Sequence, residues 1–518
     1  AAAERAFDKA AKQSPANGPG CAVGVSLDGK SVFEKGFGMA EMEYQIPITP
    51  KTIFESGSVA KQFTAAAIVA LSLDGKLSLD DPVRKYVPEM PDYGSPLTIR
   101  HLLNHTSGLR DWGSVMQLTG VGRGDRVVSQ SLAIDVIRRQ KGLDFIPGAE
   151  YSYSNSNYNL LAEIVERVSK QKFPAFMQER FFKPLAMTNS SWRDDYQRIV
   201  PGRAQAYEGP LAGPWRLSMP FMNVYGNGGM LTTVGDWLKW NAMLESRSLG
   251  AKLVDEMETV GVLNDGRKSD YALGLIVDKT NGYRRVWHNG STAGYQTILT
   301  RYPDLKLSIA VMCNLSSRNG PLEPDIFTEI MGPFPTTTRP EAFKVDPETL
   351  KKYVGIWKSE RTRMANRMTV DNGVLKINGT PLVAQSDGSF VIGPQRFVFK
   401  MGSDGNPISA EANNNGDIRT FTFQKEWNPT AEELNALAGR WYSEEADAVF
   451  TIAVENGQAV LTQRTTGDRL TLRPQFKDNY FIERPGTVLW LVRDSTGKIA
   501  TMHVGTSRLR DMQFVRMP

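Results

Sequence analysis

Two residues three positions apart, Ser58 and Lys61, have the side chains needed for nucleophilic catalysis by a serine. A serine hydroxyl is a weak nucleophile until a base removes its proton, and a lysine held in a dry pocket can lose its own proton and act as that base. A largely apolar run follows Ser58 up to position 71, which predicts a buried helix with Lys61 in its first turn. Ser58 would then lie at the positive end of the helix dipole, beside free backbone N–H groups.

The same Ser-x-x-Lys spacing occurs at two other places, so the spacing alone is weak evidence. Ser169 and Lys172 lie at the charged end of a predicted amphipathic helix, and Ser495 and Lys498 lie in a turn between two apolar stretches. A solvated surface pair is the more common outcome for any single match. The apolar helix that follows Ser58 distinguishes the first pair from the other two.

A second motif, Tyr153-Ser154-Asn155, precedes another predicted helix. Its tyrosine is a phenol that can carry a proton, and its asparagine is an amide that can hold a substrate carbonyl or the lysine. Because an ammonium group nearby favours the charged phenolate, Lys61 would lower the pKa of Tyr153. The alternative interpretation of this motif is that its polar residues only cap the helix and that the Tyr153 ring only packs against its neighbours.

A third motif, His288-Asn289-Gly290-Ser291, lies in a predicted strand. Its glycine lets the strand lie close to a substrate, and a following backbone N–H can join that of Ser58 in binding an oxyanion. The alternative for a lone histidine is an ordinary core or surface residue.

The segments around these motifs predict one domain whose antiparallel sheet is closed from both of its ends. Residues 21–27 and 31–38 are typical of a β-hairpin, and residues 284–314 of three antiparallel strands. Helices are expected between them, at 97–105, 131–139, 158–169 and 173–182. We therefore expect a catalytic domain at 1–332 with helices on the faces of one sheet and a separate all-helical part.

The composition changes after this domain. Residues 333–345 begin with a segment rich in proline and threonine that predicts a linker. Beyond it, the pattern of residues 350–357 recurs at 434–441, and each copy opens about eighty residues of short strands and turns. We expect two small antiparallel β-barrels, at 346–428 and 429–518.

The composition and charge of the chain limit the classes of partner that we expect it to bind. A net charge of +5 and a 41% apolar content are those of a globular protein without a strongly basic surface, so we expect neither nucleic-acid binding nor a membrane span. The helical spacing of His101 and His105 suits zinc, but Leu102 stands where a zinc peptidase has its glutamate. We expect no metal and no other cofactor.

The two cysteines, Cys21 and Cys313, lie in separate apolar strands, and we expect each to be a buried free thiol. The chain begins with three alanines, which fits cleavage of a signal peptide after a small residue and fits a trimmed chain equally well. We favour a periplasmic or secreted protein, with the cytoplasm as the alternative.

Taken together, the three motifs resemble those of the penicillin-recognising serine hydrolases, which include class C β-lactamases, D-Ala-D-Ala carboxypeptidases, related esterases and D-aminopeptidases. The family pattern is Ser-x-x-Lys, then Tyr-x-Asn, then Lys-Thr-Gly or His-x-Gly. Residues 103–109 and 228–230 are similar to further landmarks of the family. The resemblance covers about residues 1–332, and the layout with two barrels is similar to that of the three-domain D-aminopeptidases.

The resemblance implies a role for each motif residue. Ser58 would be the nucleophile, Lys61 and Tyr153 the proton-transfer pair, and Asn155 a contact to the substrate amide. His288 would bridge Tyr153 and the substrate. The remaining candidates, which would form the substrate and oxyanion site together with the Ser58 N–H, are Asn289, Gly290 and Ser291. Whether Lys61 or Tyr153 is the acylation base stays open.

One segment departs from the resemblance. In the D-aminopeptidases a long loop of the last barrel reaches the active site and helps to select a free amine. The matching hairpin here, residues 482–488, is several residues shorter, which predicts a more open cleft.

We expect a serine hydrolase that cleaves small peptides or amides, including those with D-residues. One alternative is an esterase or β-lactamase-like hydrolase that uses the same site. The other is a non-catalytic penicillin-binding sensor, against which the presence of every chemical group argues. Assembly into a homo-oligomer is left open.

Overall fold

The structure is a computed structural model that describes residues 1–518 except 122–126, 318–321, 333–342, 415 and 485. The chain forms two compact units, which are described separately. The first comprises residues 1–113 and 122–335, and the second comprises residues 114–121 and 336–518. Most of the predicted linker at 333–345 lies outside the described residues, and the predicted domain boundaries stay predictions.

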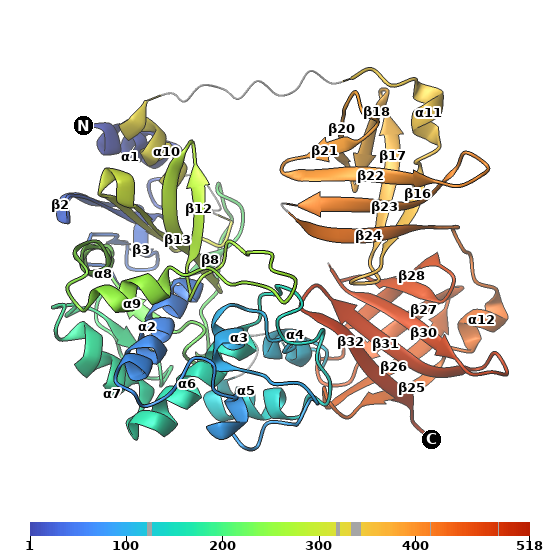
Figure 1. Cartoon of the computed structure of the whole chain (residues 1–518), viewed down its shortest axis with the longest axis horizontal. Coiled ribbons are helices and arrows are strands. Elements are labelled where there is room, and N and C mark those ends of the chain that lie inside the picture. Colours follow the sequence, from blue (N-terminus) through green and yellow to red (C-terminus); the bar gives the residue numbers. More distant parts are fainter. Residues whose placement is uncertain (122–126, 318–321, 333–342, 415, 485) are drawn as a thin grey trace. The chain divides into compact units, whose positions relative to one another are not determined.

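The first unit contains a six-stranded antiparallel sheet, in the order β12-β13-β14-β15-β1-β2 (Figure 1). Its strands are β12 (Ile276–Thr280), β13 (Tyr283–Thr292), β14 (Tyr295–Tyr302), β15 (Leu307–Cys313), β1 (Cys21–Leu27) and β2 (Lys30–Phe37). The hairpin from the start of the chain therefore pairs with the strands that end the domain, as predicted. The sequence analysis missed β12.

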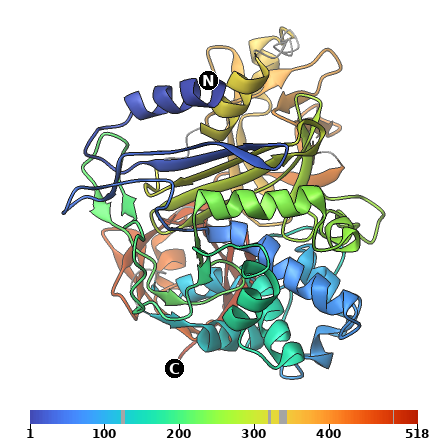
Figure 2. The ribbon, with the colours of Figure 1, turned by 90° about the vertical axis from the view of Figure 1, so that its left-hand side faces the viewer.

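Helices cover both faces of this sheet (Figure 2). On one face, α1 (Ala2–Lys12) and α10 (Leu322–Met331) pack together over a core that includes Phe7, Val23 and Phe327. On the other face, α8 (Val234–Ser246) packs against β1, β2 and β15. Apolar side chains on both faces of the central strands are thus removed from water, which is the main stabilising contribution to such a layered domain.

The remaining helices form a separate cluster around α2 (Ala60–Leu73), which is buried from residue 60 to residue 71. Its partners are α9 (Ala251–Met257) and α6 (Asn155–Ser169). Helix α6 also contacts α3 (Ile99–Leu103), α5 (Gln130–Arg138) and α7 (Phe173–Met177). The buried helix predicted after Ser58 is therefore present. Within the described residues, no helix combines the length and apolar character needed to cross a membrane.

The prediction of two free thiols is wrong, because Cys21 and Cys313 form a disulfide. The two residues lie directly opposite each other in the β1–β15 pairing. They are 292 positions apart in the chain, so their proximity depends on the sheet topology rather than on local sequence. Both are buried.

The second unit contains two antiparallel β-structures, as predicted. The first is a nine-stranded sheet in the order β19-β18-β17-β16-β24-β23-β22-β21-β20. Its end strands, β19 (Thr380–Pro381) and β20 (Val383–Ala384), follow each other closely in the chain, so the sheet curls back on itself. The other strands are β18 (Val374–Ile377), β17 (Ala365–Asp371), β16 (Gly355–Ser359), β24 (Asp417–Gln424), β23 (Pro407–Asn414), β22 (Gln395–Met401) and β21 (Phe390–Ile392).

The second β-structure is a closed eight-stranded barrel, β25 to β32. Its strands are β25 (Gly439–Ser443), β26 (Ala448–Glu455), β27 (Gln458–Gln463), β28 (Arg469–Phe476), β29 (Asn479–Ile482), β30 (Val488–Arg493), β31 (Ile499–Thr506) and β32 (Leu509–Arg516). The predicted repeat is visible in both β-structures. Trp357 Nε1 donates to the Tyr353 carbonyl at 2.9 Å, and Trp441 Nε1 donates to the Leu437 carbonyl at 3.0 Å.

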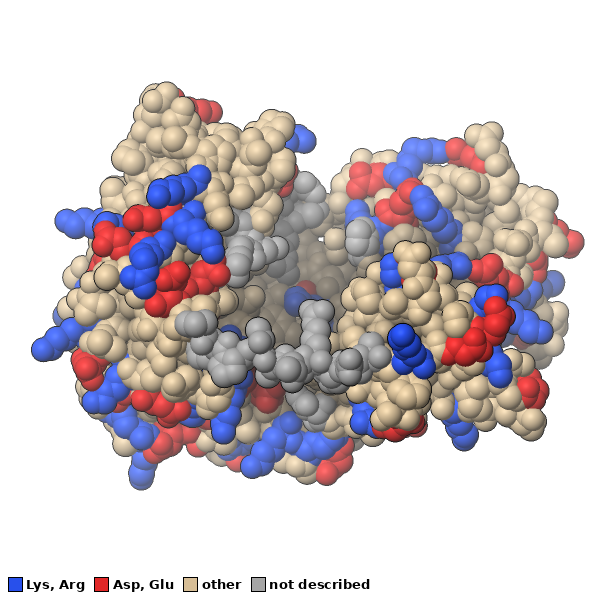
Figure 3. Space-filling view, turned by 90° about the horizontal axis from the view of Figure 1, so that it is seen from above, with Lys and Arg blue, Asp and Glu red and all other residues tan. Residues whose placement is uncertain are grey.

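Charged side chains of both signs are mixed over the described part of the face shown in Figure 3. Elsewhere in the described part of the chain, many charged side chains form ion pairs, such as Arg167 with Glu89 and Arg100 with Asp80. Exposed pairs of this kind contribute little to stability.

Candidate active site

Ser58 lies in a tight turn between a short strand and α2. Strand β5 (Phe54–Glu55) leads into a single 3₁₀ turn at Gly57–Val59, and α2 begins at Ala60. Ser58 is half-buried, while Gly57 and Val59 on either side are buried. The helix start predicted here is present, with Val59 as the N-cap of α2. The Ser58 hydroxyl lies within hydrogen-bond distance of Lys61.

Lys61 is fully buried, and oxygen atoms from three residues lie close to its ammonium nitrogen. The distances from Nζ are 3.1 Å to Ser58 Oγ, 2.9 Å to Asn155 Oδ1 and 2.6 Å to the Asn227 carbonyl. Two of these partners are carbonyl oxygens, which can only accept. A neutral amine would donate its two N–H groups to them and turn its lone pair towards the Ser58 hydroxyl. The geometry thus suits a lysine that exchanges a proton with Ser58.

Asn155 is fixed in one orientation by a buried carboxylate. Asp111 Oδ2 accepts from both the backbone N–H and the Nδ2 group of Asn155, each at 2.8 Å. The amide oxygen is therefore directed to Lys61. Neither Asp111 nor the Asn227 carbonyl was predicted from the sequence. Asn227 belongs to a glycine-rich loop that was interpreted as tight packing near a site, and the loop does pack closely there, since a Cβ at Gly226 would lie 2.4 Å from the Tyr158 carbonyl oxygen.

Tyr153 lies immediately before α6, and its ring is close to Lys61. The Lys61 Nζ is 4.9 Å from the centre of this ring, within the range of a cation–π contact. The His105 ring packs on Tyr153 at a centroid distance of 4.2 Å. His105 Nδ1 is 3.0 Å from Asn157 Nδ2, and His101 Nδ1 is 3.3 Å from the Thr98 backbone nitrogen. The two histidines with zinc spacing thus contact neighbouring polar groups and rings of this region.

His288 is buried on β13, and both of its ring nitrogens have partners. Nδ1 is 2.6 Å from the Asn289 carbonyl oxygen, and Nε2 is 3.1 Å from the Tyr271 hydroxyl. Burial, and then the positive charge of Lys61, lower the pKa of His288 to about 3, so the ring is neutral around pH 7. The bridge expected between Tyr153 and substrate stays a prediction. Tyr271 had no motif to identify it in the sequence.

The backbone N–H groups of Ser58 and Ser291 lie at the junction of the Ser58 turn and β13. A Cβ at Gly57 would lie 2.6 Å from the Ser291 nitrogen, and one at Gly290 would lie 3.0 Å from the Ser58 nitrogen. The pairing of strand β12 with β13 ends at Trp287. Beyond that point, Gly290 and Ser291 of β13 lie against the Ser58 turn. The two nitrogens predicted to bind an oxyanion are thus brought together, while the Asn289 and Ser291 side chains are exposed.

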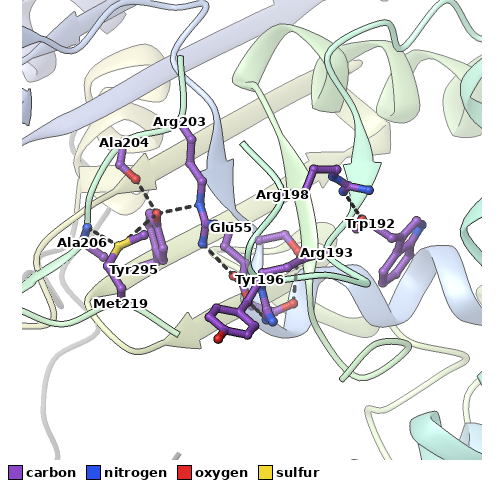
Figure 4. Close-up of polar contacts among 12 residues, drawn as sticks. Glu55, Trp192, Arg193, Tyr196, Arg198, Arg203, Ala204, Ala206, Met219 and Tyr295 are labelled. Atoms are coloured by element: carbon purple, nitrogen blue, oxygen red, sulfur yellow. Dashed lines mark hydrogen bonds and ion pairs between the residues drawn. The ribbon is translucent and has the colours of Figure 1, made fainter. Parts of the chain in front are cut away.

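A buried charge network anchors the strand that leads to Ser58 (Figure 4). Arg193 binds Glu55 with two nearly parallel bonds of 2.9 and 2.8 Å, and Arg203 lies 3.4 Å from the same carboxylate. Arg203 also donates to the Tyr295 hydroxyl at 3.3 Å. Such a two-bond pair fixes both distance and angle. The network therefore holds β5 in place directly before the Ser58 turn.

Comparisons with known proteins agree with this architecture. A family model described as Beta-lactamase matches residues 7–328. The chain is similar to the D-aminopeptidase of Gluconobacter oxydans (strain 621H), with 26% identity over 96% of each chain. Its fold is similar to that of the octameric penicillin-binding protein homologue from Pyrococcus abyssi, with a TM-score of 0.56, 21% identity and 99% of each chain covered. It is also similar to the D-amino acid amidase from Ochrobactrum anthropi, with a TM-score of 0.53 and 21% identity over 64% of this chain and 97% of that one.

Proposed function

Because this chain belongs to the beta-lactamase family, we propose that it is a serine hydrolase that cleaves small peptides or amides through an acyl-enzyme on Ser58. The contact that carries the proposal is the 3.1 Å approach of the buried Lys61 ammonium nitrogen to the Ser58 hydroxyl. A lysine in such surroundings can take the serine proton because burial disfavours its charged form. The two carbonyl partners of Lys61 support this role.

The proposed reaction has two stages. In the first, Ser58 Oγ attacks the substrate carbonyl carbon, its proton passes to Lys61 or Tyr153, and the N–H groups of Ser58 and Ser291 bind the oxyanion. The C–N bond then breaks, and the leaving amine takes up a proton from the same pair. In the second stage, water gives a proton to the same pair and attacks the ester carbonyl carbon. The bond from that carbon to Ser58 Oγ then breaks, Ser58 Oγ takes the proton back, and the acid is released. Asn155 holds Lys61 in place throughout.

The substrates we propose are amides and short peptides, with a D-residue on the acyl side as the preferred class. The similarity to a D-aminopeptidase over almost the whole chain supports this choice, as does the D-amino acid amidase among the similar folds. The segment 482–488, predicted from the sequence as a hairpin, is short, and its residue 485 lies outside the described residues. From its length we propose further that a free N-terminal amine is not required. In that case, N-acylated and longer peptides would be cleaved as well as single aminoacyl amides.

Antibiotic hydrolysis is the less favoured alternative on the same site. Where relatives of this family carry the cation of a Lys-Thr-Gly motif, this chain has His288, which is neutral around pH 7 because its pKa is lowered to about 3. A neutral imidazole offers no charge to attract a carboxylate. We therefore expect weak activity, or none, against a penicillin or cephalosporin.

A compartment outside the cytoplasm is also proposed. The buried Cys21–Cys313 disulfide supports this location, since disulfides persist in oxidising compartments and are rare in the cytosol. Cell fractionation tests this proposal directly, and recovery of the protein with reduced thiols from the cytosol contradicts it.

The function is tested with a fluorophosphonate probe and a substrate panel. We expect the probe to label the full chain at Ser58, and mass spectrometry of the digest locates the adduct. The panel contains L- and D-aminoacyl p-nitroanilides, their N-acetyl forms, p-nitrophenyl esters and nitrocefin. Turnover confined to the esters favours the esterase alternative. A chain that neither reacts with the probe nor turns over any substrate is a sensor, and the proposal is then wrong.

A further inference from the structure

Tyr271 is a buried tyrosine whose hydroxyl lies 3.1 Å from His288 Nε2. Its side chain is 3% exposed, and that of His288 is 2% exposed. The backbone at Tyr271 is held by neighbouring segments, because its carbonyl accepts from the Gly261 N–H at 2.9 Å and Asn104 Nδ2 donates to the Ala272 carbonyl at 3.3 Å. Tyr271 therefore contacts His288 from a fixed position.

The hydrogen-bond partners determine where the proton on His288 resides. The Asn289 carbonyl can only accept, so Nδ1, which lies 2.6 Å away, carries the proton. In the neutral ring Nε2 then has a free lone pair, which accepts the Tyr271 O–H. Burial raises the pKa of Tyr271 well above its usual value, so the phenol keeps its proton and remains a donor.

We propose that Tyr271 is a positioning residue of the acyl-transfer site, whose hydroxyl holds His288 as the neutral Nδ1–H tautomer and thereby keeps β13 residues 288–291 against the Ser58 turn. This inference rests on the proposed function. The His288 ring is the link, because its Nδ1–H bonds to the backbone of the next residue and its Nε2 bonds to Tyr271. Ser291, three positions after His288, supplies the second oxyanion donor.

Among the described residues, the groups around His288 include the charge of Lys61 and several phenols, and the Tyr158 side chain also forms a hydrogen bond with Tyr271. Lys61 on α2 is the charge that, after burial, lowers the pKa of His288. The Tyr153 and Tyr271 rings lie 6.2 and 5.7 Å from the His288 ring, and His105 packs on Tyr271 at 4.7 Å. A donated hydrogen bond to Nε2 favours the neutral ring over the charged one. Removal of the Tyr271 hydroxyl should therefore raise the pKa of His288.

Tyr271→Phe removes the hydroxyl and keeps the ring. We expect the rate of fluorophosphonate labelling at Ser58, and kcat on the best substrate of the panel, to fall about tenfold, which is the rate equivalent of one lost hydrogen bond. KM should change less than twofold. Tyr302→Phe is the matched control, because it also removes a buried hydroxyl, which donates to Glu323 Oε1 at 3.0 Å in the first unit. It should leave both rates unchanged.

The ¹⁵N signals of the His288 ring report the hydrogen bond itself, which a change in packing alone would not alter. The chain has four histidines, so ¹⁵N-histidine labelling of the full protein gives few signals, and the His288 signal is identified by its loss in His288→Asn. In the unmodified protein we expect a protonated Nδ1 and a hydrogen-bonded Nε2. In Tyr271→Phe the Nε2 signal should shift towards that of a free nitrogen, and the pKa of His288 should rise. The signals of His101 and His503 should stay in place.

The outcomes separate the two proposals. If Tyr271→Phe folds and neither the labelling rate nor the His288 signal changes, Tyr271 has no positioning role. If Tyr271→Phe does not fold, the unmodified protein still decides, since a protonated or free Nε2 on His288 overturns the inference. If the unmodified protein fails to react with the probe and the substrates, the proposed function fails, while the nitrogen signals still test the bond between Tyr271 and His288.

Discussion

Ser58–Lys61 and Ser169–Lys172 have the same spacing, yet their lysines have opposite surroundings. The Lys61 side chain is completely buried, and its ammonium nitrogen contacts Ser58 Oγ, Asn155 Oδ1 and the Asn227 carbonyl oxygen. The Lys172 side chain is 84% exposed, and its ammonium group lies 3.8 Å from Glu166 Oε2. The first lysine is enclosed by protein groups, whereas the second extends into water beside a carboxylate. The surroundings of the lysine, rather than the spacing, therefore distinguish a candidate base from a surface cation.

The difference arises from where each serine lies relative to a helix. Ser58 precedes α2, so Lys61 is in the first turn of a helix that is buried on all sides. Ser169 is the last residue of α6, where the chain leaves the helix through Lys170 in a left-handed conformation with φ of 61°. Helical spacing no longer applies beyond that point, and Lys172 points into solvent.

The strongest test of this comparison is Ser58→Ala. We expect all measurable turnover to be lost while the fold survives, because the mutation removes the attacking oxygen and little else. The far-UV circular dichroism spectrum and the thermal midpoint serve as controls. With the unmodified protein, an adduct on Ser169 or Ser495 would reverse the comparison.

The next largest effects are expected from the proton-transfer pair. Lys61→Met and Tyr153→Phe should each lower kcat by about 10²-fold or more, as is usual for groups that move a proton. Lys172→Met is the matched control, since it removes a lysine that also follows a serine by three positions in the sequence. A normal kcat in either site variant removes that residue from the mechanism.

The surroundings of Lys61 can also be weakened without changing the lysine. Asp111→Ala removes the carboxylate that orients Asn155, so we expect kcat to fall about tenfold and the free energy of unfolding to fall by about 1–3 kcal/mol. Steady-state kinetics and urea unfolding measure the two quantities. If stability falls and kcat does not, Asp111 supports the fold without positioning the amide.

A smaller effect concerns acid stability. The pKa of His288 is lowered from 6.5 to about 3 in the folded state, so between these values the unfolded chain binds a proton that the folded chain does not. The free energy of unfolding should therefore fall as the pH falls below 6.5, by up to about 1.4 kcal/mol per pH unit from this residue. Urea unfolding at pH 7 and pH 5 measures the slope. The slope should be shallower in His288→Asn, and an equal slope in both proteins contradicts the prediction.

The smallest effect is expected at the third Ser-x-x-Lys pair. Ser495 and Lys498 are exposed in a turn, where the Lys498 backbone N–H donates to Asp494 Oδ1 at 3.1 Å. Because a backbone group makes this bond, Ser495→Ala and Lys498→Ala should leave kcat unchanged and alter the free energy of unfolding by less than about 0.5 kcal/mol. A clear loss of activity in either variant would place a functional group in the last barrel.

Much of the fold could be predicted because its signals are local. The hairpin at the start, the three strands from Tyr283 to Cys313 and the tryptophan-bearing repeat each have a period or turn pattern that is visible within a few dozen residues. The Tyr-x-Asn and His-x-Gly motifs identified candidate groups in the same way. Strand β12 was missed because it is short and lies half-buried near the edge of the sheet.

The missing parts of the site depend on contacts that no local pattern records. Asn227 contributes its backbone carbonyl to Lys61, and a carbonyl is the same in every residue. Asp111 and Tyr271 are single residues that reach Asn155 and His288 from other segments of the chain. The Cys21–Cys313 bond likewise depends on two strands that the topology brings together. Such partners emerge only once the elements are placed in space.

The position of β1 between β2 and β15 has a consequence for synthesis. The β1–β2 hairpin is made at once, but the strand that pairs with the other edge of β1 ends at Cys313. At usual elongation rates, the 292 residues that separate the two cysteines take about 15–60 s to make. Throughout that time the nascent chain carries one apolar strand with an open edge, which is prone to pair with other chains. The sheet of the first unit therefore cannot be completed until β15 has been made, and the disulfide can form only from that point on.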